Sequence, residues 1–326
     1  MYKSKLDVRQ TQEAIHLIKK HFQKTFSKKL CLIRASAPLF VDSQLKINDY
    51  LNGEKPVRFT AKGFENKFEI LHSLAKWKRV ALKKYNIPTY EGIYTDMNAI
   101  RREEDLDYLH SFYVDQWDWE IHINKKDRNT SYLHKIVKKI YSVIKELEEY
   151  IIAKFPVLEQ KLPQDLTIIT SQELADIYPK LTPEEREREY VKTHKAIFIS
   201  QIGHPLSDGV PHGKRAFDYD DWKFNGDLIF YDAVNDNAIE ISSMGIRVDA
   251  KSLKIQQTTL EVEEDKLAPY HYAIFNKHLP FSIGGGIGQS RLCMFLLEKK
   301  HIGEVQSSFW PEDKIIEWKN EGIELL

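Results

Sequence analysis

The sequence predicts an α+β fold in which an antiparallel sheet is flanked by helices. Residues 92–101 and 110–124 have the apolar and alternating patterns typical of strands, and an acidic loop of residues 102–109 separates them. Residues 8–27 and 130–153 instead carry apolar side chains three and four positions apart, which is typical of amphipathic helices. We therefore expect one antiparallel sheet of six or more strands with helices packed against it.

The first predicted helix leads into a strand and a polar loop. Residues 30–35 are apolar enough for a strand, and Pro38 ends it. Residues 41–56 are polar and contain turn-forming residues, which predicts a loop. Asp49 lies in this loop, where an aspartate is most often an ordinary turn residue.

A strand followed by a lysine-bearing helix comes next. Residues 67–70 alternate like a strand, and Ser73 is expected to cap the following helix. Lys78 lies on that helix, where a lysine is normally solvated. Because the helix follows a strand end, where α/β folds place ligands, Lys78 is also a candidate for a substrate contact.

The strand predicted over residues 110–124 has two chemically different faces. Gln116, Asp118 and Glu120 share one face, and two tryptophans lie on the other. Such a polar row could be a solvated sheet face or the wall of a site. Arg101 ends the preceding strand, and its planar guanidinium is suited to a phosphate.

A predicted hairpin later in the chain carries further charged residues. Its strands begin near Asp227 and Ala238, with turn residues between them. Glu240 and Arg247 have opposite parity, so both can face one site only if the strand contains a bulge, for which Gly245 is a candidate. Structural ion pairing among these charged groups is the alternative to a site.

The loop of residues 203–222 is rich in histidine and aspartate. The spacing of its histidines is irregular, which argues against zinc. Arg215 and the cluster of Asp218, Asp220 and Asp221 are more typical of contacts to phosphates and an amino group.

A glycine-rich stretch near the C-terminal end gives the most distinctive local signal. Four glycines fall within residues 284–288, and a helix is expected to begin near Gln289. A strand, a glycine floor and a helix start would put free N–H groups beside the glycines, where they could bind an anion. Arg291 lies in the first helical turn, where a cation opposes the helix dipole, so a ligand phosphate would explain its position. The alternative is a glycine-rich turn with a solvated arginine.

Composition excludes some functions. Lysine plus arginine and aspartate plus glutamate both number 48, so the formal net charge is zero, and a protein that holds a long nucleic acid usually shows a basic excess. Cys31 and Cys293 match no metal spacing, which fits a reducing compartment. We see no signal-peptide pattern and no membrane-length apolar span, so we expect a soluble, cytoplasmic protein without a membrane partner.

Five stretches in sequence order resemble one family. The chain is similar to the ammonia-dependent asparagine synthetases (aspartate–ammonia ligases), which use the catalytic core of class II aminoacyl-tRNA synthetases. The matching stretches are 72–79 (HSLAKWKR), 113–120 (YVDQWDWE), 218–222 (DYDDW), 242–249 (SSMGIRVD) and 284–291 (GGGIGQSR).

The resemblance implies a single catalytic domain over residues 1–326, a homodimer formed through the N-terminal helix, and use of ATP and Mg²⁺. It implies a site in which some residues are catalytic and others bind ATP, the amino acid or the metal. The catalytic residues are Asp49, Arg101 and Asp118; the ATP-binding residues are Arg101, Arg215, Asp220, Ser243, Gly286, Gly288 and Arg291; the substrate-binding residues are Ser73, Lys78, Gln116, Asp118 and Arg247; the metal-binding residues are Asp227 and Glu240.

The implied reaction is synthesis of L-asparagine from L-aspartate and ammonia through β-aspartyl-AMP, with release of AMP and pyrophosphate. No nucleic acid partner is expected. Two alternatives remain open: a class II synthetase-like enzyme that acts on tRNA or on a protein, and a regulator that binds an amino acid without catalysis.

Overall fold

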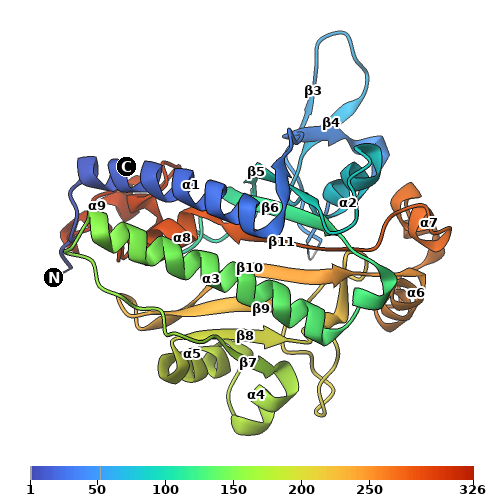
Figure 1. Ribbon diagram of the computed structural model, residues 1–326. Coiled ribbons are helices and arrows are strands. Elements are labelled where there is room, and N and C mark those ends of the chain that lie inside the picture. Colours follow the sequence, from blue (N-terminus) through green and yellow to red (C-terminus); the bar gives the residue numbers. More distant parts are fainter. Residues whose placement is uncertain (1, 52) are drawn as a thin grey trace.

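The computed structural model describes residues 2–51 and 53–326 and confirms the α+β prediction (Figure 1). Within these residues, eight strands form one large sheet. Across the sheet the strands are β1 (Leu32–Arg34), β5 (Gly92–Ile100), β6 (Tyr113–His122), β11 (Ser282–Gly288), β10 (Asn237–Arg247), β9 (Asp220–Asp232), β8 (Ala196–Ser200) and β7 (Thr167–Thr170).

The centre of the sheet is antiparallel, as predicted, but both edge pairs are parallel. Strands β5, β6, β11, β10, β9 and β8 pair antiparallel in that order. The edge strand β1 runs parallel to β5, and β7 runs parallel to β8. Helices α4 (Ser171–Ile177) and α5 (Pro183–His194) connect β7 to β8. This helical crossover returns the chain in the same direction, which accounts for the parallel pair.

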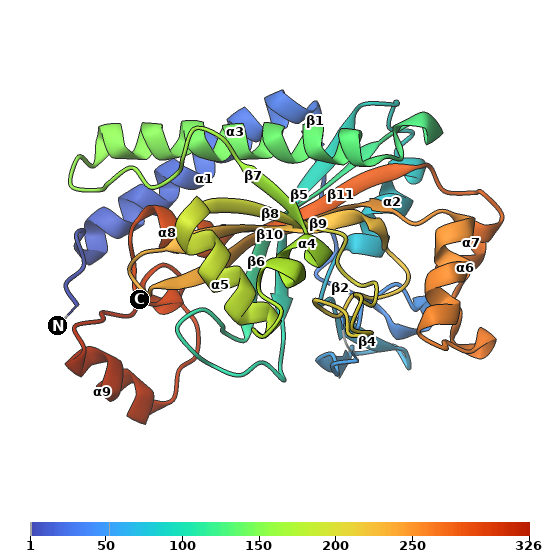
Figure 2. The same ribbon diagram turned by 90° about the horizontal axis from the view of Figure 1, so that it is seen from below.

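Two long helices, α1 (Val8–Leu30) and α3 (Thr130–Lys154), lie side by side across one face of the sheet (Figures 1 and 2). On this face Phe22 stacks on Trp117 with 4.2 Å between ring centroids, and Phe26 meets Trp119 edge to face at 6.3 Å. Because side chains alternate along β6, the polar side chains between these tryptophans face the opposite side of the sheet. The main core therefore leaves that opposite side free for a polar site.

A second, smaller sheet was not predicted from the sequence. It contains β2 (Phe40–Asp42), β4 (Lys67–Ile70) and β3 (Arg58–Thr60), and only β4 was expected. The predicted loop of residues 41–56 instead begins with the end of β2 and a short 3₁₀ helix, Ser43–Leu45. The strands β2 and β3 have three residues each, too few for a periodic pattern to be recognised.

The remaining helices lie on the other face and at the ends of the sheet, except the helix at Gln289–Leu296, which packs beside α1 in the main core (Figure 2). Helix α5 begins with a capping box formed by Thr182 and Glu185. In α2 the N-cap is Leu74 rather than the expected Ser73, although Ser73 Oγ accepts a hydrogen bond from Ala75 N at 3.0 Å. Across residues 2–51 and 53–326, no helix is long and apolar enough to cross a membrane. The helices not yet named are α2 (Ala75–Lys84), α6 (Ala250–Thr259), α7 (Pro269–Phe275), α8 (Gln289–Leu296) and α9 (Glu312–Asn320), with short 3₁₀ helices at Lys125–Asp127, Glu264–Lys266 and Ile302–Glu304.

Candidate active site

A cavity of about 440 Å³ lies against the sheet, and strands β6, β10 and β11 contribute to its walls. Most of the residues predicted for the site meet here, although they come from segments far apart in the chain. Asp227 is the exception, since it is not among the residues that line the cavity. The predicted residues that line the cavity are Asp49, Ser73, Lys78, Arg101, Gln116, Asp118, Arg215, Asp220, Glu240, Ser243, Arg247, Gly286, Gly288 and Arg291.

The glycines of β11 have a different role from the predicted one. Strand β11 pairs with β6 on one side and β10 on the other, so its N–H groups belong to the sheet rather than to a free anion site. What the glycines provide is room. A Cβ on Gly284 would lie 1.9 Å from Glu120 Oε2, and a Cβ on Gly286 would lie 2.5 Å from Gln116 Oε1. The glycine floor therefore lets polar side chains of β6 lie flat across β11.

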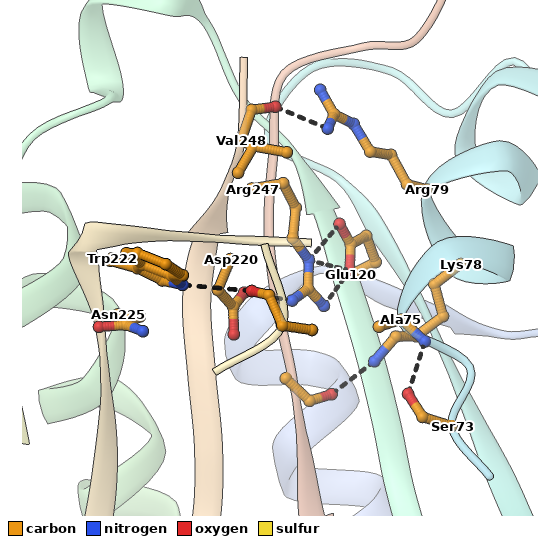
Figure 3. A network of polar contacts seen from close by, with 12 residues as sticks. Ser73, Ala75, Lys78, Arg79, Glu120, Asp220, Trp222, Asn225, Arg247 and Val248 are labelled. Atoms are coloured by element: carbon orange, nitrogen blue, oxygen red, sulfur yellow. Dashed lines mark hydrogen bonds and ion pairs between the residues drawn. The ribbon is translucent and has the colours of Figure 1, made fainter. Parts of the chain in front are cut away.

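A buried ion-pair network surrounds Arg247, which lines the cavity (Figure 3). The Arg247 Nε and Nη2 atoms donate to Glu120 at 2.7–3.0 Å, and Nη1 donates to Asp220. The predicted bulge is present, because the pairing of β10 with β9 shifts register between Gly245 and Arg247 and again after Glu240. These shifts allow residues of opposite parity to face one cavity.

A second buried ion pair joins Lys78 and Asp118 beside this network. Lys78 Nζ also donates to the carbonyl oxygen of Gly285 at 2.8 Å, and burial lowers the pKa of the Lys78 amine. Asp118 Oδ2 is buried and accepts no hydrogen bond from the residues that the structure describes. We call the five side chains of the two networks the paired end of the cavity: Lys78, Asp118, Glu120, Asp220 and Arg247.

A second set of charged groups on the cavity wall has looser contacts. Arg101 lies 4.0 Å from Glu104, and its Nε atom is buried with no hydrogen-bond partner among residues 2–51 and 53–326. Arg291 donates to the main-chain oxygen of Glu240 at 3.2 Å. We call Arg101, Arg291 and Glu240 the open end.

Arg215 and Asp227 form an ion pair beside the open end. Asp227 Oδ1 is buried and has no hydrogen-bond partner in the described part of the chain. Glu240 is exposed, yet the surrounding protein and the Asp227 carboxylate raise its pKa. A carboxylate whose charge is disfavoured by a neighbouring carboxylate provides a suitable place for a cation. No three potential metal ligands of the histidine, cysteine or acidic type cluster among the described residues, so a bound Mg²⁺ would need further oxygen ligands from phosphates and water.

Asp49 lies on the cavity wall with one carboxylate oxygen unused. Its Oδ1 accepts a hydrogen bond from Leu51 N at 3.0 Å, whereas Oδ2 is buried and unpartnered as far as the described residues go. Burial raises the pKa of Asp49 to about 6, although the nearby Lys76 amine opposes this rise. Asp49 therefore has the environment of a group that exchanges protons near neutral pH.

A charged cluster near Asp49 was only partly anticipated from the sequence. Asp218 lies 2.7 Å from Lys76 Nζ and 2.8 Å from His271 Nε2. The His271 Nδ1 atom accepts from Ala268 N at 2.7 Å, so the neutral ring donates to Asp218 from Nε2. Only Asp218 was singled out above, because no spacing in the sequence links His271 to residues so distant in the chain.

Comparisons with known proteins agree with the resemblance seen in the sequence. The family model described as aspartate–ammonia ligase matches residues 9–322. The chain is 55% identical over 313 residues to the aspartate–ammonia ligase of Fusobacterium nucleatum, covering 96% of this chain and 95% of that one. It is 53% identical over 327 residues to the protein of the same name from Ruminiclostridium cellulolyticum, covering 100% and 97%.

Solved structures with a similar fold are class II aminoacyl-tRNA synthetases. Asparaginyl-tRNA synthetase from Entamoeba histolytica aligns with a TM-score of 0.65 and 15% identity, covering 92% of this chain and 67% of that one. Asparaginyl-tRNA synthetase from Pyrococcus horikoshii, complexed with asparaginyl-adenylate, aligns with a TM-score of 0.66 and 14% identity, covering 92% and 70%. At this identity the likeness concerns the fold alone.

Proposed function

Because the chain belongs to the aspartate–ammonia ligase family, we propose that it makes L-asparagine from L-aspartate, ammonia and ATP. The observation that carries the proposal is the division of one cavity into a paired end and an open end. The paired end offers buried charges of both signs, which suits a zwitterionic amino acid. The open end offers arginines with loose contacts, which suits phosphates.

Aspartate binds at the paired end with its β-carboxylate turned toward the open end. Asp118 Oδ2, which is buried without a hydrogen-bond partner in the described residues, accepts from the α-ammonium group. Arg247 and Lys78 attract the α-carboxylate, with Gln116 and Ser73 as neutral contacts on the same wall. This orientation distinguishes the reaction from that of an aminoacyl-tRNA synthetase, which activates the α-carboxylate.

ATP binds at the open end, near Arg291, Arg215 and the glycine floor. A β-carboxylate oxygen of aspartate attacks the α-phosphorus, and the bond to the bridging pyrophosphate oxygen breaks. The products of this step are β-aspartyl-AMP and pyrophosphate. Arg101 stabilises the charge that builds on the α-phosphoryl oxygens, and its unpartnered Nε and loose contact with Glu104 leave it available for that role.

Ammonia then attacks the acyl carbon of β-aspartyl-AMP, and the bond from this carbon to the AMP oxygen breaks to release asparagine and AMP. Only neutral ammonia is a nucleophile, so an ammonium ion must first lose a proton. Asp49 is the acceptor that we favour, because Oδ2 has no hydrogen-bond partner among the residues described and the pKa is raised to about 6. Asp118 is a second carboxylate on the same wall.

Asp227 and Glu240 are the residues that would hold Mg²⁺, and Asp227 Oδ1 fits this role because no described residue donates a hydrogen bond to it. When bound, the ion would neutralise charge on the phosphates. Arg215 pairs with the other oxygen of Asp227 and so leaves Oδ1 as the oxygen available to the ion. A homodimer formed through α1 is also part of the proposal.

The proposal is tested by incubating the purified protein with ATP, aspartate and ammonium, with and without tRNA. We expect asparagine, AMP and pyrophosphate in equal amounts, at a rate that tRNA does not change. ADP and phosphate as products would contradict attack at the α-phosphorus. Formation of aspartyl-tRNA would instead indicate a synthetase.

A further inference from the structure

A hydrogen-bond network connects two of the arginines assigned to ATP, Arg101 and Arg291, although none of its central residues was singled out in the sequence. Gln306 is 5% exposed and lies in the C-terminal segment after α8. Its Oε1 accepts from Ser111 Oγ at 2.5 Å, and its Nε2 donates to Ser290 Oγ at 3.0 Å. Ser111 belongs to the loop that follows Arg101, and Ser290 directly precedes Arg291.

Asp115 supports the same helix start from a neighbouring strand. Helix α8 begins after Gly288, which has no side chain to cap it. Asp115 Oδ1 accepts from the N–H of Ser290 at 3.0 Å and therefore caps the helix in place of a local residue. Gln306 Nε2 lies 3.5 Å from the same oxygen, and Lys19 Nζ lies 3.2 Å from Asp115 Oδ2.

The two serines that Gln306 connects, Ser111 and Ser290, both lie close to an arginine of the cavity. The N–H of Arg101 donates to the carbonyl oxygen of Phe112 at 2.8 Å. This bond joins the two ends of the loop that contains Ser111. Arg291 follows Ser290 within the first turn of α8. Ser111, Ser290 and Gln306 also line the cavity. A displacement of Gln306 would therefore change the separation of the two arginines.

We propose that Asp115 and Gln306 are positioning residues, which hold the Arg101 loop and the Arg291 helix at the separation that the ATP phosphates require. The inference rests on the proposed function only for the identity of the ligand. Neither residue is among the side chains assigned to aspartate, so we expect the affinity for aspartate to change little. The expected signature is a selective loss of affinity for ATP.

The test compares Gln306→Ala and Asp115→Ala with Gln257→Ala. Gln257 is a matched control because it is 3% exposed, lies on α6, and donates to Val262 O at 2.9 Å away from the cavity lining. Dissociation constants for ATP and for aspartate are measured by titration calorimetry, with the KM of each and the melting temperature. We expect the two site variants to bind ATP about tenfold more weakly, equivalent to about 1.4 kcal/mol, and aspartate within about twofold of wild type. The control should keep both affinities.

Asp115→Asn distinguishes loss of the cap at the start of α8 from a general loss of protein stability. Its amide oxygen can still accept from Ser290 N, so we expect ATP affinity within about threefold of wild type, even if the melting temperature falls. If Asp115→Ala does not fold, Gln306→Ala and Asp115→Asn complete the test. Wild-type ATP affinity in folded Gln306→Ala, or equal losses for ATP and aspartate, would overturn the inference. Failure of the wild type to make asparagine would refute the proposed function. The binding measurements would still test whether Asp115 and Gln306 position the two arginines.

Discussion

The charged groups at the two ends of the cavity differ in how closely they are paired with opposite charges. At the paired end, Arg247 is 2% exposed and Glu120 is fully buried, and each charged group contacts an opposite charge directly. At the open end, the Arg101 side chain is 26% exposed and lies 4.0 Å from its carboxylate neighbour. The protein therefore pairs its own charges at the end where we propose that the amino acid binds, and leaves arginines without close counter-charges at the end where we propose that the nucleotide binds.

Under the proposed function, the size and charge of the two ligands account for this difference. A small zwitterion cannot neutralise several buried charges, so the protein must pair them itself to offset their desolvation. A triphosphate brings several negative charges, and arginines already committed to buried carboxylates would gain little by exchanging partners. We therefore expect changes at the paired end to lower the free energy of unfolding most, and changes at the open end to lower kcat most.

The largest expected effect concerns Arg247→Met. The substitution leaves Glu120 and Asp220 buried without their cation, so we expect the free energy of unfolding to fall by about 3–5 kcal/mol. Urea denaturation measures this loss. Arg291→Met is the control at the open end, where we expect a change below about 1 kcal/mol because its contact is with an exposed main-chain oxygen. Equal losses in the two variants would remove the distinction between the ends.

Arg101→Ala tests the open end from the side of catalysis. Loss of one charge-stabilising contact typically raises the barrier by about 3 kcal/mol, so we expect kcat to fall by on the order of a hundredfold. The unfolding free energy should stay within about 1 kcal/mol of wild type, because the ion pair with Glu104 is long and partly exposed. Steady-state kinetics and urea denaturation are measured on the same preparation. Wild-type turnover would refute the assignment of Arg101.

Asp49 tests a cavity carboxylate that has one oxygen unpartnered in the described structure. Burial raises its pKa from 3.8 to about 6. Between these values the folded state binds more protons than the unfolded state, so the contribution of Asp49 to the unfolding free energy increases as the pH falls from about 7 to about 4. The increase is up to about 3 kcal/mol for a shift of about two pKa units.

The measurement for Asp49 is the difference in unfolding free energy between wild type and Asp49→Asn at several pH values. Other titrating groups are common to both proteins and largely cancel. We expect wild type to gain stability relative to the variant as the pH falls through 6. A difference that does not change with pH would show that Asp49 keeps an ordinary pKa despite its burial.

Several features of the cavity wall could be predicted from the sequence. The alternation along residues 113–122 correctly separated the polar face of β6 from its tryptophan face, because strand periodicity depends only on local geometry. The parity conflict between Glu240 and Arg247 correctly predicted a bulge. The start of α8 at Gln289 was also correct. Local rules and the family resemblance together therefore gave the wall residues of the cavity.

What the sequence could not show depends on contacts between distant segments. Gln306 and His271 belong to the C-terminal third, and nothing in their local patterns points to Ser111 or Asp218. The strand pairing also changed the interpretation of the glycines, since only the register shows that Gly284 makes room for Glu120. The site roles, the homodimer and the single domain over residues 1–326 stay predictions.

Gly284→Ala tests whether the ion pair between Glu120 and Arg247 needs a residue without a side chain at position 284. Its Cβ would lie 1.9 Å from Glu120 Oε2 and 2.7 Å from Arg247 Nη2, so the ion pair must move. We expect a loss of about 1–3 kcal/mol in unfolding free energy, the usual cost of overpacking, together with a higher KM for aspartate. Gly213→Ala is the control, because its Cβ would meet only an ordinary contact of 3.4 Å with Ile202. If both variants behave like wild type, the glycine is not needed for the network.

The smallest expected effect is a selective one and concerns Asp118→Asn. The carboxylate holds Lys78 through Oδ1, and Oδ2 is assigned to the α-ammonium of aspartate. An amide keeps the shape but loses the charge, so we expect KM for aspartate to rise about tenfold or more, which is about 1.4 kcal/mol, with KM for ATP within about twofold. Asp232→Asn serves as control, since Asp232 is 5% exposed but does not line the cavity.

This variant also tests which carboxylate of the substrate reacts. If Asp118 holds the α-ammonium group, aspartate lies with its β-carboxylate toward ATP, and hydroxylamine should trap the β-hydroxamate in wild type and, more slowly, in Asp118→Asn. The α-hydroxamate, or aspartyl-tRNA on addition of tRNA, would show that the amino acid lies the other way round. In that case the paired end would bind the side chain of aspartate, and the α-carboxylate would face ATP.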